Sequence, residues 1–381
     1  MNKKDNKVEV NFWDYLIFVL SSIGIFLSSI ILALSSFLFF SFKFLTRRRS
    51  WLILVLALVT FASAFLIYWF IFPLPWKVSQ ESLSLMVKEG VNMRQVVGQL
   101  KELGIISEGR VFILVGKITG LDRKIQPGRY DFHKGITRYS LLGKLVRGEI
   151  VYTDVTIPEG LTIRQIAGIL KNSIGTDSAE FVRITHDRRL IDSLGMESSN
   201  LEGYLFPNTY NLYPGIPNSK ILEEMIGEFD KVFDENLTQR ARQTGFSIHK
   251  VVTLASMIEK ETQIDEERPI ISSVFHNRLK LGMPLQCDPT VIYALSGLDR
   301  PLYTKDLQIN SPYNTYKHYG LPPGPICSPG GKSIIAALYP SKTDYLYFVA
   351  KKDGNHIFSN SLAKHNRARH EARKLSATQN K

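Results

Sequence analysis

The chain has 381 residues, of which 44% are hydrophobic, so it can form an anchor and about two domains with buried cores. Its net charge of +12 suits an acidic polymer, anionic lipid or nucleic acid, but no zinc-finger spacing, RNA-recognition signature or aromatic-interleaved lysine run is present. We therefore expect no nucleic-acid partner. Two cysteines, Cys287 and Cys327, form neither a metal-binding pattern nor a disulfide framework, and two free thiols are the simpler interpretation.

Two stretches without charged residues, 15–42 and 51–76, open the chain. Each is longer than the roughly 20 residues that cross a bilayer, and neither resembles a cleaved signal peptide. Residues 1–77 are therefore predicted to be a membrane anchor with two transmembrane helices. Four basic residues separate the stretches and three precede the first, so the positive-inside rule favours a cytoplasmic inter-helix loop by one charge. That topology places the large domain on the outer side of the cytoplasmic membrane, whereas the opposite one leaves it in the cytosol.

A repeat follows the anchor. Residues 87–101 (VKEGVNMRQVVGQLK) and 157–171 (IPEGLTIRQIAGILK) share identical residues at matching positions, and a fainter copy begins at Gly135. Each copy is typical of a short strand, a Gly turn, an Asn or Thr N-cap and an amphipathic helix. Such a unit must pack on a neighbour to bury its apolar face. We predict a repeat module over residues 78–176 that resembles LysM-type units, which grip N-acetylglucosamine polymers; a purely structural duplication is the alternative.

The remainder, residues 177–381, is predicted to be a mixed α/β catalytic domain that ends in a basic tail. Helical patterns alternate with loops rich in Tyr, Asn, Pro and Gly, and an apolar strand precedes a turn at Asp353 and Gly354. The predicted helices span 220–233, 249–262 and 269–281, and the strand spans 345–350. The whole chain is thus predicted to be an α+β protein with N-terminal transmembrane helices and a catalytic acid on a helix.

The helix over residues 249–262 carries the candidate acids. On a helical wheel Glu261 falls within a broad apolar arc and Glu259 falls at its edge, while Thr253 and Ser256 face the other way. Apolar surroundings raise the pKa of a carboxyl group, and a glutamic acid that keeps its proton near neutral pH can protonate a departing sugar oxygen. The wheel does not choose between the two glutamates, and ordinary surface glutamates are the alternative.

Three loops, 201–210, 283–295 and 311–331, combine aromatic side chains with amides and carboxylates, the groups that bind sugars. Turn chemistry and aromatic core packing would produce the same composition. The candidate substrate-binding residues are Glu202, Tyr204, Tyr210, Glu261, Asn277, Gln286, Asp288, Tyr313, Asn314 and Tyr316.

Five segments together resemble the successive signatures of the endolytic murein transglycosylase, or YceG-like, family, over about Val78 to Arg367. They are IEKET, LEGYLFPNTY, NRLKLGMPLQCDPTVIYAL, SPYNTY…GLPPGPI…PG and YFVAKKDGNHIFSNSLAKHN. The resemblance implies a LysM-like portion, a catalytic domain and a membrane anchor. It also implies that the first glutamate of the E-K-E-T motif, Glu259, is the catalytic residue, with Glu261 in a supporting or binding role. The chain departs from the family pattern at Cys287, Cys327 and His276, none of which is expected to touch the acid, and in its extra apolar stretch.

The function implied by this resemblance is endolytic cleavage of the linkage between N-acetylmuramic acid and N-acetylglucosamine in nascent peptidoglycan strands. The products would carry 1,6-anhydromuramic acid ends, and the cleavage would end strand elongation. No metal or cofactor is expected, and the implied partners are glycan strands, penicillin-binding proteins and the elongation or division machinery. The alternatives are a hydrolytic muramidase, a glycan-binding scaffold without catalysis, and a pyridoxal-phosphate lyase, for which the sequence has no Gly-rich phosphate loop.

Overall fold

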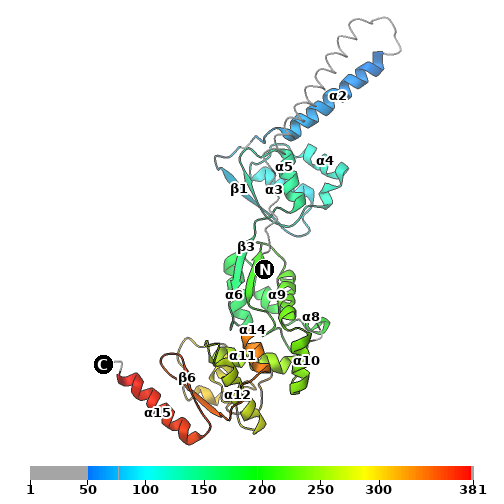
Figure 1. Ribbon diagram of the computed structural model, residues 1–381. Helices are drawn as coiled ribbons and strands as arrows, with labels where there is room; N and C mark the ends of the chain where they lie inside the picture. The colour runs from blue at the N-terminus through cyan, green and yellow to red at the C-terminus, as the bar shows by residue number, and fades with distance from the viewer. Residues whose placement is uncertain (1–49, 76, 195, 379–381) are drawn as a thin grey trace. The chain divides into compact units, whose positions relative to one another are not determined.

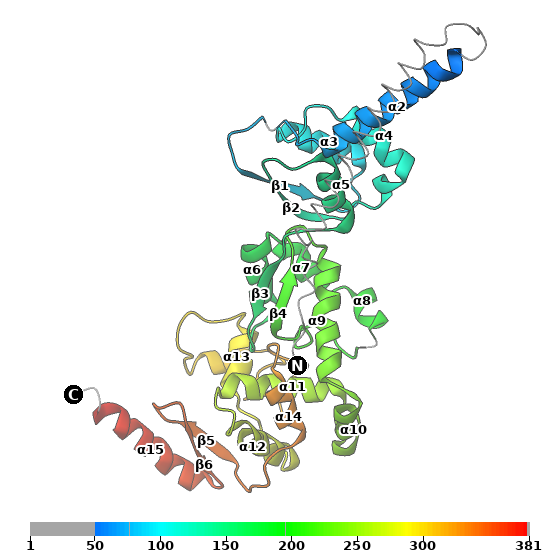
Figure 2. The same cartoon turned by 45° about the horizontal axis from the view of Figure 1, so that its top comes forward.

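The computed structural model describes residues 50–75, 77–194 and 196–378. The first predicted apolar stretch, residues 15–42, lies outside the described residues. The chain divides into two compact units, Met1–Val151 and Tyr152–Lys381. The described part is a mixed α/β structure with three two-stranded antiparallel sheets (Figures 1 and 2).

Helix α2, Ser50–Ile71, corresponds to the second predicted apolar stretch. Its segment Leu54–Ile71 has a mean hydropathy of 2.4 and is not buried by the rest of the protein, so its length and composition suffice to cross a membrane. The helix ends before the predicted limit at residue 76. Pro73 and Pro75 explain the early end, because a residue that precedes a proline is disfavoured in helical conformation.

In the first unit, a two-stranded sheet packs with helices around a core that contains Leu100, Phe112, Tyr130 and Phe132. Two helices and a 3-10 turn connect the antiparallel strands, and one helix follows them. The elements are β1 (Ser82–Val87), α3 (Met93–Glu102), α4 (Arg110–Thr119), η1 (Leu121–Arg123), β2 (Gly128–His133) and α5 (Arg138–Arg147).

The second unit begins with the same order of elements, with helices between two antiparallel strands and another helix after them. They are β3 (Thr153–Ile157), α6 (Ile163–Ile174), α7 (Ser178–Ile184), α8 (Arg188–Ser193), β4 (Asn208–Leu212) and α9 (Asn218–Val232). Equivalent tyrosines occupy the second strand of each pair. Tyr130 donates a hydrogen bond to the carbonyl of Gln126 (2.7 Å), and Tyr210 donates one to the carbonyl of Phe206 (2.5 Å), in each case four residues back.

The strand–turn–helix joint occurs four times, once more than the sequence predicts. At each joint a glycine with positive φ lies two residues before the helix N-cap. The fourth joint, at Gly215, escapes the sequence pattern because its N-cap is Pro217, which supplies no capping side chain. The second predicted repeat copy lies in the second unit, because its strand β3 pairs with β4. The division between the two compact units falls after Val151, within the predicted repeat module of residues 78–176.

The rest of the second unit surrounds helix α11 (Figure 2). Its elements are α10 (Glu235–Thr244), α11 (Ile248–Glu261), α12 (Arg268–Lys280), α13 (Asp288–Ala294), η2 (Asp306–Gln308), α14 (Gly331–Leu338), β5 (Tyr347–Ala350), β6 (His356–Ser359) and α15 (Leu362–Thr378). These confirm the predicted helices over 220–233, 249–262 and 269–281 to within about two residues, and the predicted final strand, which begins two residues later, at Tyr347.

The prediction that α11 has a polar face was wrong. Thr253 and Ser256 are 1% and 0% exposed, so the helix is buried on all sides from Val251 to Ile258. Both hydroxyls are satisfied locally: Thr253 donates to the carbonyl of His249 (2.7 Å), and Ser256 donates to the carbonyl of Thr253 (2.7 Å). A small hydroxyl that bonds to the preceding turn can be buried at low cost, which a helical wheel does not register.

Gly203, in the loop before β4, packs closely against the segment that follows the Pro-Pro-Gly turn. Its φ is +86°, and a Cβ at this position would lie 2.5 Å from the Cβ of Pro325. We expect Gly203→Ala to lower the free energy of unfolding by about 2 kcal/mol or more, because backbone strain and overpacking add. Gly168, inside α6 with open space around it, is the matched control, and Gly168→Ala should gain about 0.5–1 kcal/mol. Denaturant unfolding of both variants measures the difference, and equal stabilities would contradict the assigned packing.

Candidate active site

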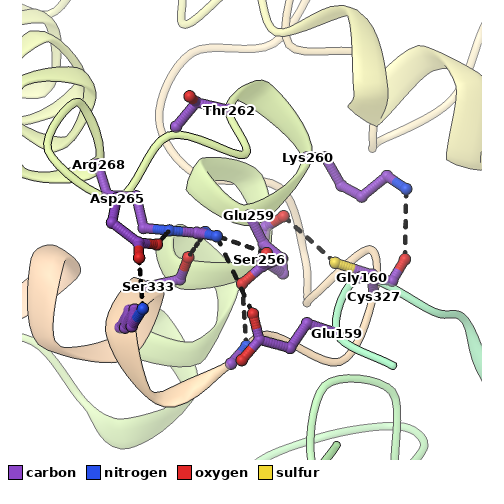
Figure 3. A network of polar contacts seen from close by, with 12 residues as sticks. Glu159, Gly160, Ser256, Glu259, Lys260, Thr262, Asp265, Arg268, Cys327 and Ser333 are labelled. Carbon is purple, nitrogen blue, oxygen red and sulfur yellow. Dashed lines mark hydrogen bonds and ion pairs between the residues drawn. The ribbon is translucent and has the colours of Figure 1, made fainter. Parts of the chain in front are cut away.

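The two candidate acids leave the last turn of α11 in different directions and have different partners. The side chain of Glu259 is 7% exposed, and its carboxylate accepts hydrogen bonds from Arg268 Nη1 (3.0 Å) and from the backbone N–H of Gly330 (3.0 Å). Arg268 also donates to Asp265 (3.1 Å) and Ser333 (2.5 Å) (Figure 3). Glu259 therefore sits in a buried ion-pair network, where both of its oxygens are already occupied.

The turn between β3 and α6 packs against this network. The backbone N–H of Gly160 donates to the carbonyl of Ser328 (2.8 Å), and the N–H of Ser328 donates to the carbonyl of Leu161 (2.8 Å). Glu159 lies 4.0 Å from Arg268, and burial, together with the charge of Glu259, raises the pKa of Glu159. A turn of the second repeat copy thus touches the same side of α11 as the network (Figure 3).

Glu261 has the environment that a general acid requires. Its side chain is partly buried, and desolvation raises its pKa from 4.5 to about 7. The charge of Asp288 acts in the same direction, while a hydrogen bond with the Cys287 thiol and the charge of Arg278 oppose it. Cys287 therefore contacts Glu261 rather than Glu259, the acid that the family resemblance implies. Near neutral pH a substantial fraction of Glu261 carries its proton.

Two of the loops singled out by the sequence meet beside Glu261. Tyr316 donates a hydrogen bond to Asp288 (2.5 Å), and Arg278 donates one to the Gln286 side chain (3.3 Å). Gln286 has a φ of +52°, and its N–H is bonded to the carbonyl of Thr315. Gln286 and Asp288 are exposed, so a phenol, an amide and a carboxylate lie close to the protonated acid and can reach a ligand.

A second carboxyl with a raised pKa, Glu202, lies on a pocket of about 470 Å³. Glu202 is 4% exposed, and burial raises its pKa to about 7 although Ile163 N–H (3.1 Å) and the Tyr293 hydroxyl (3.3 Å) donate to it. The ring of Tyr313 lies 5.0 Å from that of Tyr293. The pocket is lined by the start of α6, the end of α7, the segment before β4 and one side of α13, with Lys260.

Four predicted binding residues have structural roles. Tyr204 donates to Nδ1 of His249 (3.0 Å), because the other ring nitrogen of His249 faces the carbonyl of Pro323 (2.8 Å) and must carry the hydrogen. Tyr210 is 5% exposed in the core. Asn277 donates to the carbonyls of Thr343 and Tyr345, and the fully buried Asn314 donates to those of Leu307 and Ile309.

Arg278 and Tyr293 are functional-site residues that no sequence pattern predicted. Arg278 is 7% exposed and donates to the backbone carbonyls of Pro284, Leu285 and Leu346, which fixes the loop that carries Gln286. From the sequence alone, a basic residue within a predicted helix does not indicate that its side chain is buried. Both cysteines are free and buried, and within residues 50–75, 77–194 and 196–378 no group of three or more His, Cys, Asp or Glu side chains could hold a metal ion.

The chain matches the model of the YceG-like family over residues 85–371. It is 36% identical to the endolytic murein transglycosylase of Bacillus subtilis (strain 168) over 310 residues, which cover 77% of this chain and 85% of that protein. It is 31% identical to the endolytic murein transglycosylase of Streptococcus pneumoniae (strain D39), covering 76% of this chain but 58% of that longer protein. A crystal structure of a yceG-like protein from Listeria monocytogenes superposes with a TM-score of 0.53 at 33% identity, covering 76% of this chain and 99% of that one. The chain therefore belongs to the YceG-like family.

The raised pKa values predict how stability depends on pH. Below pH 4.5 the folded and unfolded states both hold the proton of Glu261; between pH 4.5 and about 7 only the folded state does. The free energy of unfolding must therefore fall as the pH rises through this window and level off above it. Glu202 contributes with the same sign. We expect the melting temperatures of Glu261→Gln and Glu202→Gln to rise relative to that of the unmodified chain as the pH increases from 5 to 8. A constant difference across this range would contradict the two assignments.

The Glu259 network predicts a different effect. Glu259→Ala leaves Arg268, which is 6% exposed, without its shortest carboxylate contact, and we expect a loss of about 3 kcal/mol of unfolding free energy. The exposed pair Glu180 and Arg183 is the control, and Glu180→Ala should leave the melting temperature almost unchanged. Thermal unfolding of the two variants makes the comparison, and similar small losses would show that the Glu259 pair is solvated.

Proposed function

We propose that this member of the YceG-like family is a membrane-anchored lytic transglycosylase. Its substrate would be nascent peptidoglycan, cut within the strand between N-acetylmuramic acid and N-acetylglucosamine, and the 1,6-anhydro ends would terminate elongation. The observation that carries the proposal is Glu261, whose pKa of about 7 and partial exposure, beside Gln286, Asp288 and Tyr316, equip it to give a proton to a bound sugar. Two curated relatives named endolytic murein transglycosylase support the same reaction.

In the proposed reaction, Glu261 protonates the glycosidic oxygen as the bond from C1 of the muramic acid breaks. The ionised Glu261 then accepts the proton of the C6 hydroxyl of that sugar as the C6 oxygen bonds to C1. One carboxyl group acts as acid and then as base. Ordinary glycosidases need a second carboxylate to attack or to activate water, and the internal C6 hydroxyl removes that need.

We propose Glu261 as the acid, whereas the family resemblance implies Glu259. Both carboxylate oxygens of Glu259 already accept hydrogen bonds, one from Arg268 and one from the Gly330 N–H. We propose that Glu259 instead fixes the end of α11. The resemblance concerns the whole E-K-E-T motif, so the choice between its two glutamates is open to direct test.

Sugar binding is proposed for two surfaces. The first is formed by Gln286, Asp288 and Tyr316 beside the acid. The second is the pocket at Glu202, whose Tyr293 ring, packed beside Tyr313, can pack against a sugar face. Residues 162–165 from the second repeat copy line this pocket, which supports the proposal that the LysM-like portion, residues 78–176, contributes to glycan binding.

The membrane arrangement is part of the proposal. Helix α2 is proposed as the anchor, with the catalytic domain outside the cytoplasmic membrane, where nascent glycan strands are made and where the charge bias of the sequence directs it. Penicillin-binding proteins and the elongation or division machinery are the proposed protein partners, because they produce the strands that this reaction would end.

Digestion of purified glycan strands with mass analysis of the products tests the reaction. The anhydro product is lighter than a hydrolytic product by one water, so a hydrolase is distinguished directly, and binding without cleavage would identify a scaffold. We expect Glu261→Gln to reduce the cleavage rate by about 10²–10⁴-fold. The rate of the unmodified enzyme should fall as the pH rises through about 7, since the acid must be protonated. Glu259→Gln is the matched variant; if it abolishes cleavage at unchanged stability while Glu261→Gln does not, Glu259 is the acid.

A further inference from the structure

Helix α4 of the first unit has apolar residues on two faces. Phe112 and Gly116 are buried in the core, whereas Leu114 and Ile118, four residues apart, are 57% and 76% exposed. Residues at this spacing form one stripe along a helix. Large apolar side chains that are this exposed on neighbouring turns indicate a surface that contacts another protein or a membrane.

The position of α4, beside the candidate membrane span, favours the membrane. The ring of Trp69, in the last turn of α2, lies 6.1 Å from the ring of Phe112, and α4 lies beside the end of α2 in Figures 1 and 2. Arg138 joins α5 to the same turn, since it donates to the carbonyl of Trp69 (2.9 Å) and lies over its ring at 4.4 Å. The first unit is therefore packed directly on the end of the candidate membrane span.

The link between the two is too short to separate them. Helix α2 ends at Ile71, and Leu74 is already 5% exposed in the core of the first unit. Three residues extend over at most about 10 Å, only a few ångströms more than the roughly 5–8 Å headgroup layer on either side of the hydrocarbon core. If α2 crosses a bilayer, part of the first unit must lie at its surface.

We propose that α4 lies in the interface of the bilayer that α2 spans, with Leu114 and Ile118 inserted among the lipid chains. Exposed cations flank the stripe: residues 108–124 contain Arg110, Lys117, Arg123 and Lys124 against Glu108 and Asp122, a balance of four minus two, or +2. A short helix with an apolar stripe and basic neighbours binds anionic lipid surfaces. The inference holds whichever side of the membrane the unit occupies and does not depend on the catalytic proposal.

Spin labels test the inference in the full chain, reconstituted in nanodiscs of phosphatidylcholine and phosphatidylglycerol. A label at Ile118→Cys should be relaxed more by oxygen, which partitions into lipid, than by a water-soluble nickel complex. The control is Glu89→Cys, an exposed site in the turn at the end of β1 opposite the Pro73–Thr137 bridge, where the nickel complex should dominate. Cys287 and Cys327 are 1% and 0% exposed and should not react, which the unmodified chain verifies.

Equal access of the nickel complex to the two sites would show that α4 faces water and would overturn the inference. Protection of Ile118 from both relaxing agents would do the same, because it would show that a second copy or another protein covers the stripe. Leu114→Cys provides an independent label on the same stripe and should behave like Ile118→Cys. Both substitutions are at exposed positions, so neither removes a core contact.

Discussion

The cost of holding a carboxyl group away from water determines the chemistry at the end of α11. The helix is buried on every side from Val251 to Ile258, and Glu259 and Glu261 follow in its last turn, two residues apart. The two side chains meet that cost differently: Glu259 gains a guanidinium and a backbone N–H, while desolvation raises the pKa of Glu261. The environments of these two glutamates differ because the helix turns them toward different neighbours.

The Arg268 network beside Glu259 packs in turn against the duplicated part of the fold. A strand–turn–helix unit, repeated four times, supplies the β3–α6 turn that packs against the Arg268 network and the start of α6 that lines the Glu202 pocket. In the first unit the same order of elements instead packs on the end of α2. One architecture therefore packs on two different neighbours, the end of α2 in the first unit and the Arg268 network in the second.

Local patterns in the sequence predicted the elements well, because caps and prolines set their limits. Ser247 caps α11 and Pro269 lies in the first turn of α12, and both helices start within about one residue of the prediction. Such patterns could not predict how the environments of the two glutamates differ. That difference depends on Arg268, Gly330 and Asp288, which only the tertiary fold brings close to them. Tyr210 illustrates the same limit. The composition of its loop suggested sugar binding, but its ring is buried in the core, as is the ring of Tyr130 in the first unit.

The contact between the β3–α6 turn and the segment at Ser328 is made by main-chain atoms on both sides. Such a contact constrains the number of residues more tightly than their identity. Replacement of Leu161 or Ser328 by another residue leaves these N–H and carbonyl groups in place, whereas insertion of a single residue into either segment shifts the pairing and withdraws Glu159 from Arg268. Across relatives, this junction should therefore tolerate substitution while resisting changes in length.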